Sequence, residues 1–344
     1  MPLGLADIGL LLLSFLLPFI LLLVGFPPFL RFLARKGRLL DDVHKNPPSK
    51  VPGPVGPLLF LAALIGELVV AVGFQSPVPV AIIIGTAVAF GVGLWDDLYV
   101  LGGKTKPVLL LLAGLGFVGL VLFRPSLYSS AITFPILGNV NPHLTIYTIL
   151  AVVAFPVVAN AFNMMDSFNG EISWFALLTS LALLVGGALH YAATAGFDLA
   201  RVASALPLVA IAAAFLVFNR YPSRAFDGDS GSLMFGAMFA GLTITSGVEI
   251  AAMIAIVPAI LNSFYTLSSV RGFVERRKMA ARPTYIGEDG LLHASLDAGA
   301  PSTLVRLLLL DGPLSEKDLV TNIVYLTLLA CLFSVGISVL TWVI

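Results

Sequence analysis

Acidic and amide side chains gather in short polar stretches between long apolar runs. The pair Asp96-Asp97 ends one run, and Lys104 and Lys106 follow it closely. Two adjacent carboxylates at a membrane boundary are costly unless they are paired or bind a cation. Alone, the pair also fits a solvated helix end with flanking charges, so this motif leaves a functional and a structural interpretation open.

A second polar stretch, residues 160–171, holds three asparagines and two acids. On a helix, Asn160 and Asn163 would share a face because they are three residues apart. Their amide oxygens and the Asp166 carboxylate are hard ligands that suit Mg²⁺. A helix end followed by a turn accounts for Asn169-Gly170. It does not account for the two asparagines beside an apolar helix end.

The third stretch opens a further apolar run with the sequence Phe226-Asp227-Gly228-Asp229-Ser230-Gly231-Ser232. Asp229 or Ser230 would cap the helix that begins there. A carboxylate on a glycine-flanked turn also suits close approach of a phosphate or a cation, and the N–H groups of a helix N-terminus favour an anion. Both interpretations can hold at once.

The fourth stretch is the long polar segment 271–319, which is basic at its start and contains Arg277, Lys278 and Arg282. A basic patch beside a membrane attracts anionic lipid, which explains the first two residues better than Arg282. Residues 285–293 resemble a β-hairpin with Glu-Asp-Gly at its turn. Taken together, acids that hold a divalent cation and bases that neutralise phosphates predict phosphoryl transfer onto a lipid.

Helices inside a membrane must position these stretches. Of the 344 residues, 58% are hydrophobic and only 11% charged, whereas soluble domains are about 25% charged. This composition excludes a soluble enzyme and a nucleic-acid-binding domain. Apolar runs of about 20 residues predict ten spanning helices, at residues 6–30, 55–74, 78–95, 107–124, 143–160, 172–190, 203–219, 231–247, 249–270 and 320–343. We expect a single transmembrane domain over residues 1–344, with 271–319 as an active-site insertion.

The distribution of basic residues predicts the orientation. Placing the N-terminus outside puts these loops inside: 31–54, 96–106, 161–171, 220–230 and 271–319. Every Lys and Arg except Arg124 and Arg201 then lies in an inner loop, as the positive-inside rule requires. We therefore expect both termini outside and the polar stretches at the cytoplasmic face. The first run is interpreted as a retained helix, because its basic residues follow it instead of preceding it.

These motifs, in this order, resemble the polyprenyl-phosphate N-acetylhexosamine-1-phosphate transferase family (glycosyltransferase 4 type) over nearly the whole chain. The resemblance implies an all-α polytopic fold with ten helices, a cytoplasmic active site and a small β-hairpin insertion. The segment 282–293 looks like that of the dolichyl-phosphate GlcNAc-1-phosphotransferases. The bacterial undecaprenyl-phosphate branches carry a histidine-rich motif in this segment, where this chain has only His293. Asn169 stands where many bacterial members have aspartate.

The resemblance also implies roles for individual residues. Asn163 and Asp229 look like the ligands of a Mg²⁺ cofactor, with Mn²⁺ as an alternative, and Asp96 and Asp97 look like the acidic pair beside the pyrophosphate and the acceptor. With Asn163 and Asp229, this pair forms the expected catalytic set. The expected substrate-binding residues are Lys50, Lys104, Lys106, Asn160, Asp166, Arg277, Lys278 and Arg282.

The expected reaction transfers GlcNAc-1-phosphate from UDP-GlcNAc to dolichyl phosphate, the first membrane step of lipid-linked glycan assembly. The partners are these two substrates and membrane lipids, and a homodimer is an expectation from the family. The membrane would be the cell membrane of a prokaryote or the endoplasmic reticulum of a eukaryote. Transfer of phospho-MurNAc-pentapeptide or another UDP-sugar onto undecaprenyl phosphate is the alternative. A secondary transporter is an alternative from another functional class. The mid-helix acid Glu67 is the feature that favours it, because ionisable residues inside a membrane mark ion paths. The same residue could instead pair with a polar neighbour.

Overall fold

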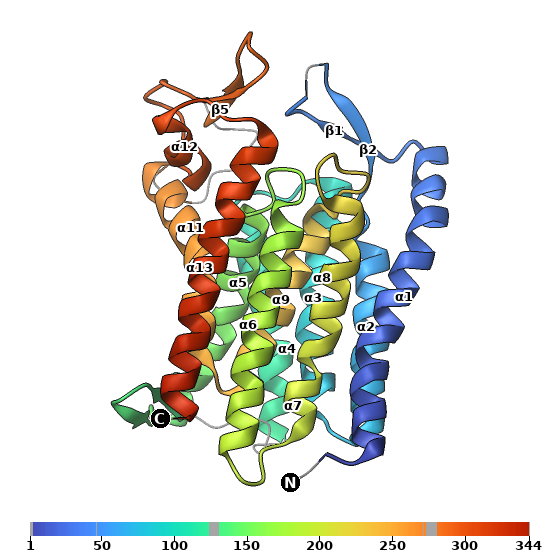
Figure 1. The fold of residues 1–344 in the computed structure, drawn as a ribbon, viewed down its shortest axis with the longest axis vertical. Coiled ribbons are helices and arrows are strands. Elements are labelled where there is room, and N and C mark those ends of the chain that lie inside the picture. The colour runs from blue at the N-terminus through green and yellow to red at the C-terminus, as the bar shows by residue number, and fades with distance from the viewer. Residues whose placement is uncertain (1–2, 46, 124–130, 271, 273–280, 344) are drawn as a thin grey trace.

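The computed structural model describes residues 3–45, 47–123, 131–270, 272 and 281–343. Long helices lie side by side as an elongated bundle (Figure 1). The helices are α1 (Leu5–Arg35), α2 (Gly56–Gly73), α3 (Val78–Tyr99), α4 (Thr105–Phe123), α5 (Leu144–Met164), α6 (Glu171–Ala193), α7 (Leu199–Ala203), α8 (Ala205–Asn219), α9 (Gly228–Ser246), α10 (Glu249–Ala255), α11 (Val257–Ser269), α12 (Leu304–Leu308) and α13 (Glu316–Trp342).

The apolar helices identify a multi-pass membrane protein. Within the described residues, seven helical segments are long and apolar enough to span a membrane, with α7 and α8 taken as one segment. The pair α10 and α11 adds an eighth if it counts as one span, although it bends by 66° at its break. Each of the ten predicted runs overlaps a helix, but α4 is short as an apolar helix and α9 is not apolar enough. The count of ten spans therefore stays a prediction.

Helix α9 lies at the centre of the bundle. It packs most extensively against α3 and then against α5, and nearly all of its side chains are buried. Since protein surrounds it, its glycines and hydroxyl residues need not face lipid. Close packing through small residues is the usual way in which helices associate inside membranes.

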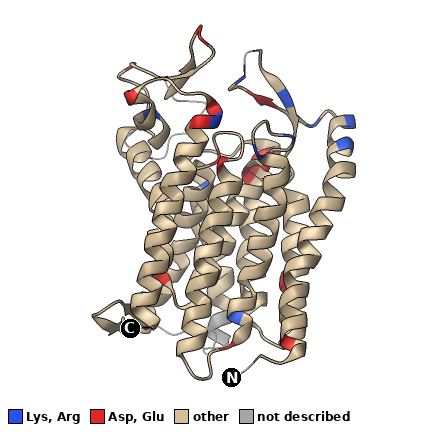
Figure 2. Ribbon diagram, in the orientation of Figure 1, with Lys and Arg blue, Asp and Glu red and all other residues tan. Residues whose placement is uncertain are grey.

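Most charged residues lie at one end of the bundle (Figure 2), where Figure 1 labels β1, β2 and β5. We call this end the charged end. Helix α1 begins and α13 ends at the opposite end (Figure 1). The orientation of the charged end relative to the membrane stays a prediction.

Three short antiparallel pairs of strands connect the helices. At the charged end, β1 (Leu39–Asp42) pairs with β2 (Ser49–Pro52), and β5 (Thr284–Ile286) pairs with β6 (Leu292–Ala294). At the opposite end, β3 (Ile132–Phe134) pairs with β4 (Gly138–Val140). The chain between β5 and β6 lies within the stretch where the sequence predicts a hairpin.

The mid-helix acid Glu67 lies in α2 and is buried. Its polar neighbour is the Ser204 side chain, which interacts with the Glu67 carboxylate.

Candidate active site

The candidate site forms where the end of α3 meets the start of α9. Gly93 makes this approach possible: a Cβ atom at this position would lie 2.4 Å from the backbone oxygen of Asp229 and 2.6 Å from the Cα atom of Ser230. No side chain larger than hydrogen fits there without moving one of the helices. Gly93 thus brings the acidic pair of α3 against the Gly-Asp-Ser turn of α9.

Asp97 connects α3 to α9 through hydrogen bonds. Its Oδ1 atom accepts the backbone N–H of Asp229 at 2.8 Å, and its Oδ2 atom accepts that of Ser230 at 3.0 Å. These N–H groups belong to the first turn of a helix, where no intrahelical partner exists. The sequence predicts a cap from Asp229 or Ser230 themselves. This prediction is wrong, because the cap comes from α3.

Asp96 and Asp229 share the ammonium group of Lys106, which lies at the start of α4. The Nζ atom of Lys106 is 2.8 Å from Asp96 Oδ2 and also forms an ion pair and hydrogen bond with Asp229 Oδ2. Lys104, by contrast, is exposed in the turn before α4. Of the two lysines expected near phosphate, the structure brings Lys106 into the site.

Asn163, near the end of α5, completes the cluster. Its Nδ2 group donates to Asp229 Oδ1 at 2.9 Å and to Ser232 Oγ at 2.8 Å. Ser232 is buried in α9; it ends the polar stretch 226–232, but the sequence assigns it no role. Its spacing of three residues from Asp229 is the signal that places both on one face of the helix.

The cluster remains accessible from outside the protein. The Asp229 side chain is 27% exposed, that of Lys106 16% and that of Asp96 13%. A substrate phosphate can therefore reach these groups without unfolding of the bundle. Carboxylates, an amide and a lysine are side chains whose chemistry suits cations and phosphates.

The donor set suits Mg²⁺ in its chemistry. Asp96, Asp229 and Asn163 supply hard oxygen atoms, which are the ligands that Mg²⁺ prefers. In the described part of the chain, no three Asp, Glu, His or Cys side chains stand together as a metal site. The Nδ2 group of Asn163 faces Asp229 and Ser232, so its amide would have to rotate for the amide oxygen to hold a cation beside Asp229.

A further buried carboxylate lies immediately before α9. Asp227 is fully buried, and neither of its oxygens has a hydrogen-bond partner among the described residues. Burial raises the pKa of Asp227 well above its ordinary value, and the negative charge of Asp166 raises it further. The expected site residue Asp166 therefore lies near Asp227, to which the sequence assigns no role.

The remaining expected site residues lie outside this cluster. The Asn160 side chain donates to the Pro156 carbonyl of its own helix at 2.7 Å. Lys50, on β2, forms an exposed ion pair with Asp41 at 3.6 Å, and Arg282 is exposed. Arg277 and Lys278 lie outside the described residues.

Asn262 holds the segment 281–315 against the end of α5. Its Nδ2 group, on α11, donates to the Met164 carbonyl at 2.8 Å, and its Oδ1 atom accepts the backbone N–H of Leu304 at 2.9 Å. Leu304 begins α12. A single buried amide therefore connects this segment to the residue that follows Asn163.

Comparisons with known proteins show which family the part of the chain that carries the candidate site is similar to. Residues 79–247, which hold the acidic pair, Asn163 and Asp229, match the family described as glycosyl transferase family 4. A protein of Saccharolobus solfataricus is 28% identical over 233 residues, covering 67% of this chain and 69% of its own length. It carries the provisional name UDP-N-acetylglucosamine–dolichyl-phosphate N-acetylglucosaminephosphotransferase.

Two further relatives match more of the chain. A protein of Sulfolobus acidocaldarius with the same provisional name is 24% identical over 345 residues, covering 96% of this chain and 97% of its own length. The phospho-N-acetylmuramoyl-pentapeptide-transferase of Halalkalibacterium halodurans is 27% identical over 288 residues, covering 78% of this chain and 85% of its own. Motifs, match and relatives agree that residues 79–247 of this chain are similar to glycosyl transferase family 4.

Proposed function

We propose that the protein transfers GlcNAc-1-phosphate from UDP-GlcNAc to dolichyl phosphate or a related polyprenyl phosphate. The observation that carries the proposal is the cluster of Asp96, Lys106, Asn163 and Asp229 at the charged end of a membrane bundle. It joins a cation-binding donor set to a phosphate-binding lysine where a lipid phosphate would lie. The names of the two archaeal relatives support UDP-GlcNAc and dolichyl phosphate as substrates.

The composition of segment 281–319 favours the dolichyl type over the peptidoglycan type. This segment carries a short strand pair and one histidine, His293. The His293 ring lies 3.0 Å from the Asp289 carboxylate and stacks on Tyr285. It is thus engaged within its own hairpin. The match to a pentapeptide transferase keeps other UDP-sugars and undecaprenyl phosphate in the test below.

The proposed reaction is an in-line displacement at phosphorus. An oxygen of the acceptor phosphate forms a bond to the sugar-linked phosphorus of UDP-GlcNAc. The bond from that phosphorus to the bridging oxygen breaks, and UMP leaves with this oxygen. An acceptor phosphate with a second pKa of about 6 is mostly dianionic at neutral pH, so a strong base is not required. Asp96 orients the acceptor or takes its last proton.

The other side chains of the site bind substrate phosphate, hold the cation or fix the position of α9. Lys106 binds a phosphate oxygen, and Asn163 and Asp229 would hold Mg²⁺, with Asp96 beside them. When bound, this cation supplies positive charge that stabilises the leaving phosphate. Asp97 keeps the start of α9 in place through the two N–H groups of Asp229 and Ser230.

The test measures UMP release by the purified protein from UDP-GlcNAc and dolichyl phosphate, with Mg²⁺ or with EDTA. We expect UMP and an equal amount of lipid-linked sugar with Mg²⁺, and neither with EDTA. Product from another UDP-sugar or from undecaprenyl phosphate alone would overturn the proposed substrates. A folded protein that forms no lipid-linked product from any of them, but takes up solute in liposomes, would support a transporter.

A further inference from the structure

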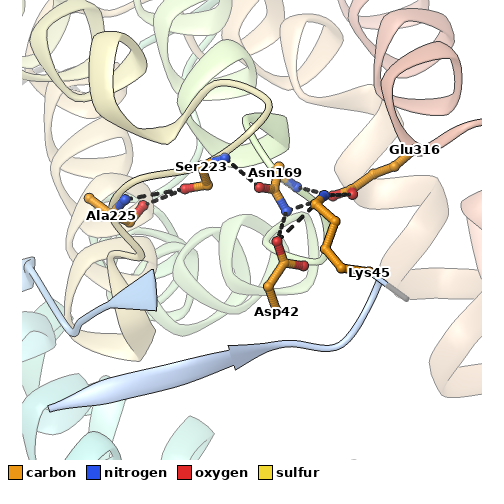
Figure 3. Close-up of polar contacts among 6 residues, drawn as sticks. All are labelled: Asp42, Lys45, Asn169, Ser223, Ala225 and Glu316. Carbon is orange, nitrogen blue, oxygen red and sulfur yellow. Dashed lines mark hydrogen bonds and ion pairs between the residues drawn. The ribbon is translucent and has the colours of Figure 1, made fainter. Parts of the chain in front are cut away.

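A buried polar junction surrounds Asn169, in the connection between α5 and α6 (Figure 3). Its Nδ2 group donates to Glu316 Oε1 at 2.6 Å and to Asp42 Oδ2 at 3.2 Å. Its Oδ1 atom accepts the backbone N–H of Ser223 at 2.6 Å, and its own N–H donates to Glu316 at 2.9 Å. The amide is thus bonded at both ends. An Asn-Gly turn accounts for Gly170, whose φ is 87°, but not for these contacts.

The junction joins four segments that lie far apart in the sequence. Asp42 ends β1, Glu316 begins α13, and Ser223 lies in the connection from α8 to α9. Asn169, Asp42 and Glu316 are each at least 94% buried, since their exposed fractions are 2%, 3% and 6%. Buried polar groups that hydrogen-bond to one another fix the relative positions of the segments that carry them.

The charges of the junction require an amide at position 169. Two carboxylates face its Nδ2 group, and Lys45 is the basic residue that contacts both. Its Nζ atom is 3.5 Å from Asp42 Oδ2 and also pairs with Glu316. The same ammonium lies 4.1 Å from the centre of the Tyr221 ring. A carboxylate in place of the amide would meet two others with one lysine to balance them, and like charges in a buried site repel strongly.

The two loop segments joined by Asn169 lead directly to the candidate site. Asn169 follows Asn163 by six residues, and Ser223 precedes Asp229 by six. The hydrogen bond from Ser223 to Asn169 therefore ties the chain after one candidate metal ligand to the chain before the other. Groups that orient metal ligands affect metal affinity even when they do not touch the metal.

We propose that Asn169 is a positioning residue, which sets the relative placement of Asn163 and Asp229 through its hydrogen bonds with Ser223, Glu316 and Asp42. The inference rests on the proposed function, because only in that function do Asn163 and Asp229 hold a metal ion and need a fixed separation. Glu316 and Asp42 hold the amide in place, and Lys45 balances their charge.

An exchange of two side chains tests the proposal. Asn169→Asp places a carboxylate against Asp42 and Glu316, whereas the double variant Asn169→Asp/Asp42→Asn restores one amide and two carboxylates beside Lys45. Asp42 Oδ1 has no hydrogen-bond partner among the described residues, so an asparagine at position 42 can keep its oxygen there and donate to residue 169. Asn139→Asp, on β4 at the opposite end, is the control for the same change of charge.

Two measurements are made on each variant: the thermal unfolding temperature without substrate, and the Mg²⁺ concentration that gives half-maximal UMP release. Asn169→Asp is expected to lower the unfolding temperature and to raise the half-activating Mg²⁺ concentration by about 10-fold or more, the effect of losing a group that orients a metal ligand. The double variant is expected to recover part of both values, because Glu316 Oε1, which lies 2.6 Å from the native amide nitrogen, still faces the new carboxylate. Asn139→Asp is expected to match the wild-type protein.

Two results would overturn the inference. An unchanged Mg²⁺ requirement in Asn169→Asp would show that the junction supports the fold without positioning the ligands. A double variant as impaired as Asn169→Asp would show that Asp42 and Asn169 do not interact as proposed. If UDP-GlcNAc is not the donor, the wild-type protein itself releases no UMP, whereas the unfolding temperatures still report on the exchange. Failure of the proposed function is thereby distinguished from failure of this inference.

Discussion

Asp97 accepts the backbone N–H group of Asp229 at 2.8 Å, so one candidate catalytic acid holds the backbone of another. The second oxygen of Asp97 accepts the N–H of Ser230. Both oxygens are therefore engaged in the connection between α3 and α9. This geometry assigns Asp97 a positioning task, whereas Asp96 and Lys106 present their charges to the site.

Replacing Asp97 with Asn tests this assignment. The amide keeps one acceptor oxygen and turns an N–H₂ group toward a backbone N–H, so one of the two bonds is lost. We expect the protein to lose about 0.5–2 kcal/mol of stability, as when a helix cap is removed, together with most of its activity. Thermal unfolding and UMP release measure the two effects. A variant as stable as the wild-type protein would contradict the capping role.

The close approach at Gly93 predicts that alanine substitutions at two glycines of α3 have very different effects on activity. Gly93→Ala places a methyl group 2.4 Å from the Asp229 carbonyl oxygen, whereas a Cβ atom at Gly91 meets nothing within 4 Å. Displacing catalytic groups by about 1 Å can cost ~10²-fold in rate. We therefore expect Gly93→Ala to lose activity on this scale and Gly91→Ala to retain it. Equal UMP release by the two variants would contradict an active site at the contact between α3 and α9.

Substitutions of Lys106 and Lys104 are a second test variant with its matched control. Lys106→Met removes the ammonium shared by Asp96 and Asp229, and with it the charge that binds a phosphate oxygen. Losing a preorganised group that stabilises transition-state charge costs roughly 10²–10³-fold in kcat. Lys104→Met should leave most activity, because this residue is exposed in the turn before α4. Steady-state UMP release compares the two, and a larger loss at Lys104 would reverse the assignment.

Asp229→Ala and Asn163→Ala should each abolish most turnover. Asp229 supplies the carboxylate that Lys106 and Asn163 contact, and Asn163 supplies the amide of the candidate metal site. The decisive measurement is UMP release over a range of Mg²⁺ concentrations, with unfolding temperatures as the check on folding. Near-normal turnover in either folded variant would remove that residue from the proposed ligand set.

The positions of the helices could be predicted from hydropathy, but their ends could not. The first run was expected over residues 6–30, whereas α1 continues to Arg35. The eighth run was expected from residue 231, whereas α9 begins at Gly228. Hydropathy detects the apolar part of a helix, and backbone hydrogen bonds carry the helix beyond it into polar sequence. The extra turn of α9 is the turn that holds Asp229.

The sequence could predict four acidic and amide residues of the cluster, but not their contacts or the other members. Asp96, Asp97, Asn163 and Asp229 come together as the motifs suggested, because each lies at a helix end on the same side of the bundle. Which lysine joins them depends on the turn between α3 and α4, which the spacing of Lys104 and Lys106 does not determine.

The junction around Asn169 was not predictable for a related reason. Its partners come from positions 42, 223 and 316, and local sequence around Asn169 resembles an ordinary turn. Only the packing of the helices brings these positions together. Charged residues in polar loops are usually solvated, so nothing in the sequence marks Asp42 and Glu316 as buried.

The polar character of α9 has a consequence for biogenesis. A segment that is not apolar enough to span a membrane alone would partition poorly into lipid as it leaves the translocon. Its main packing partners, α3 and α5, precede it in the chain and are already synthesised when α9 emerges. We expect α9 to enter the bilayer as part of a preformed helical assembly, so that the catalytic turn is built only after the earlier helices have inserted.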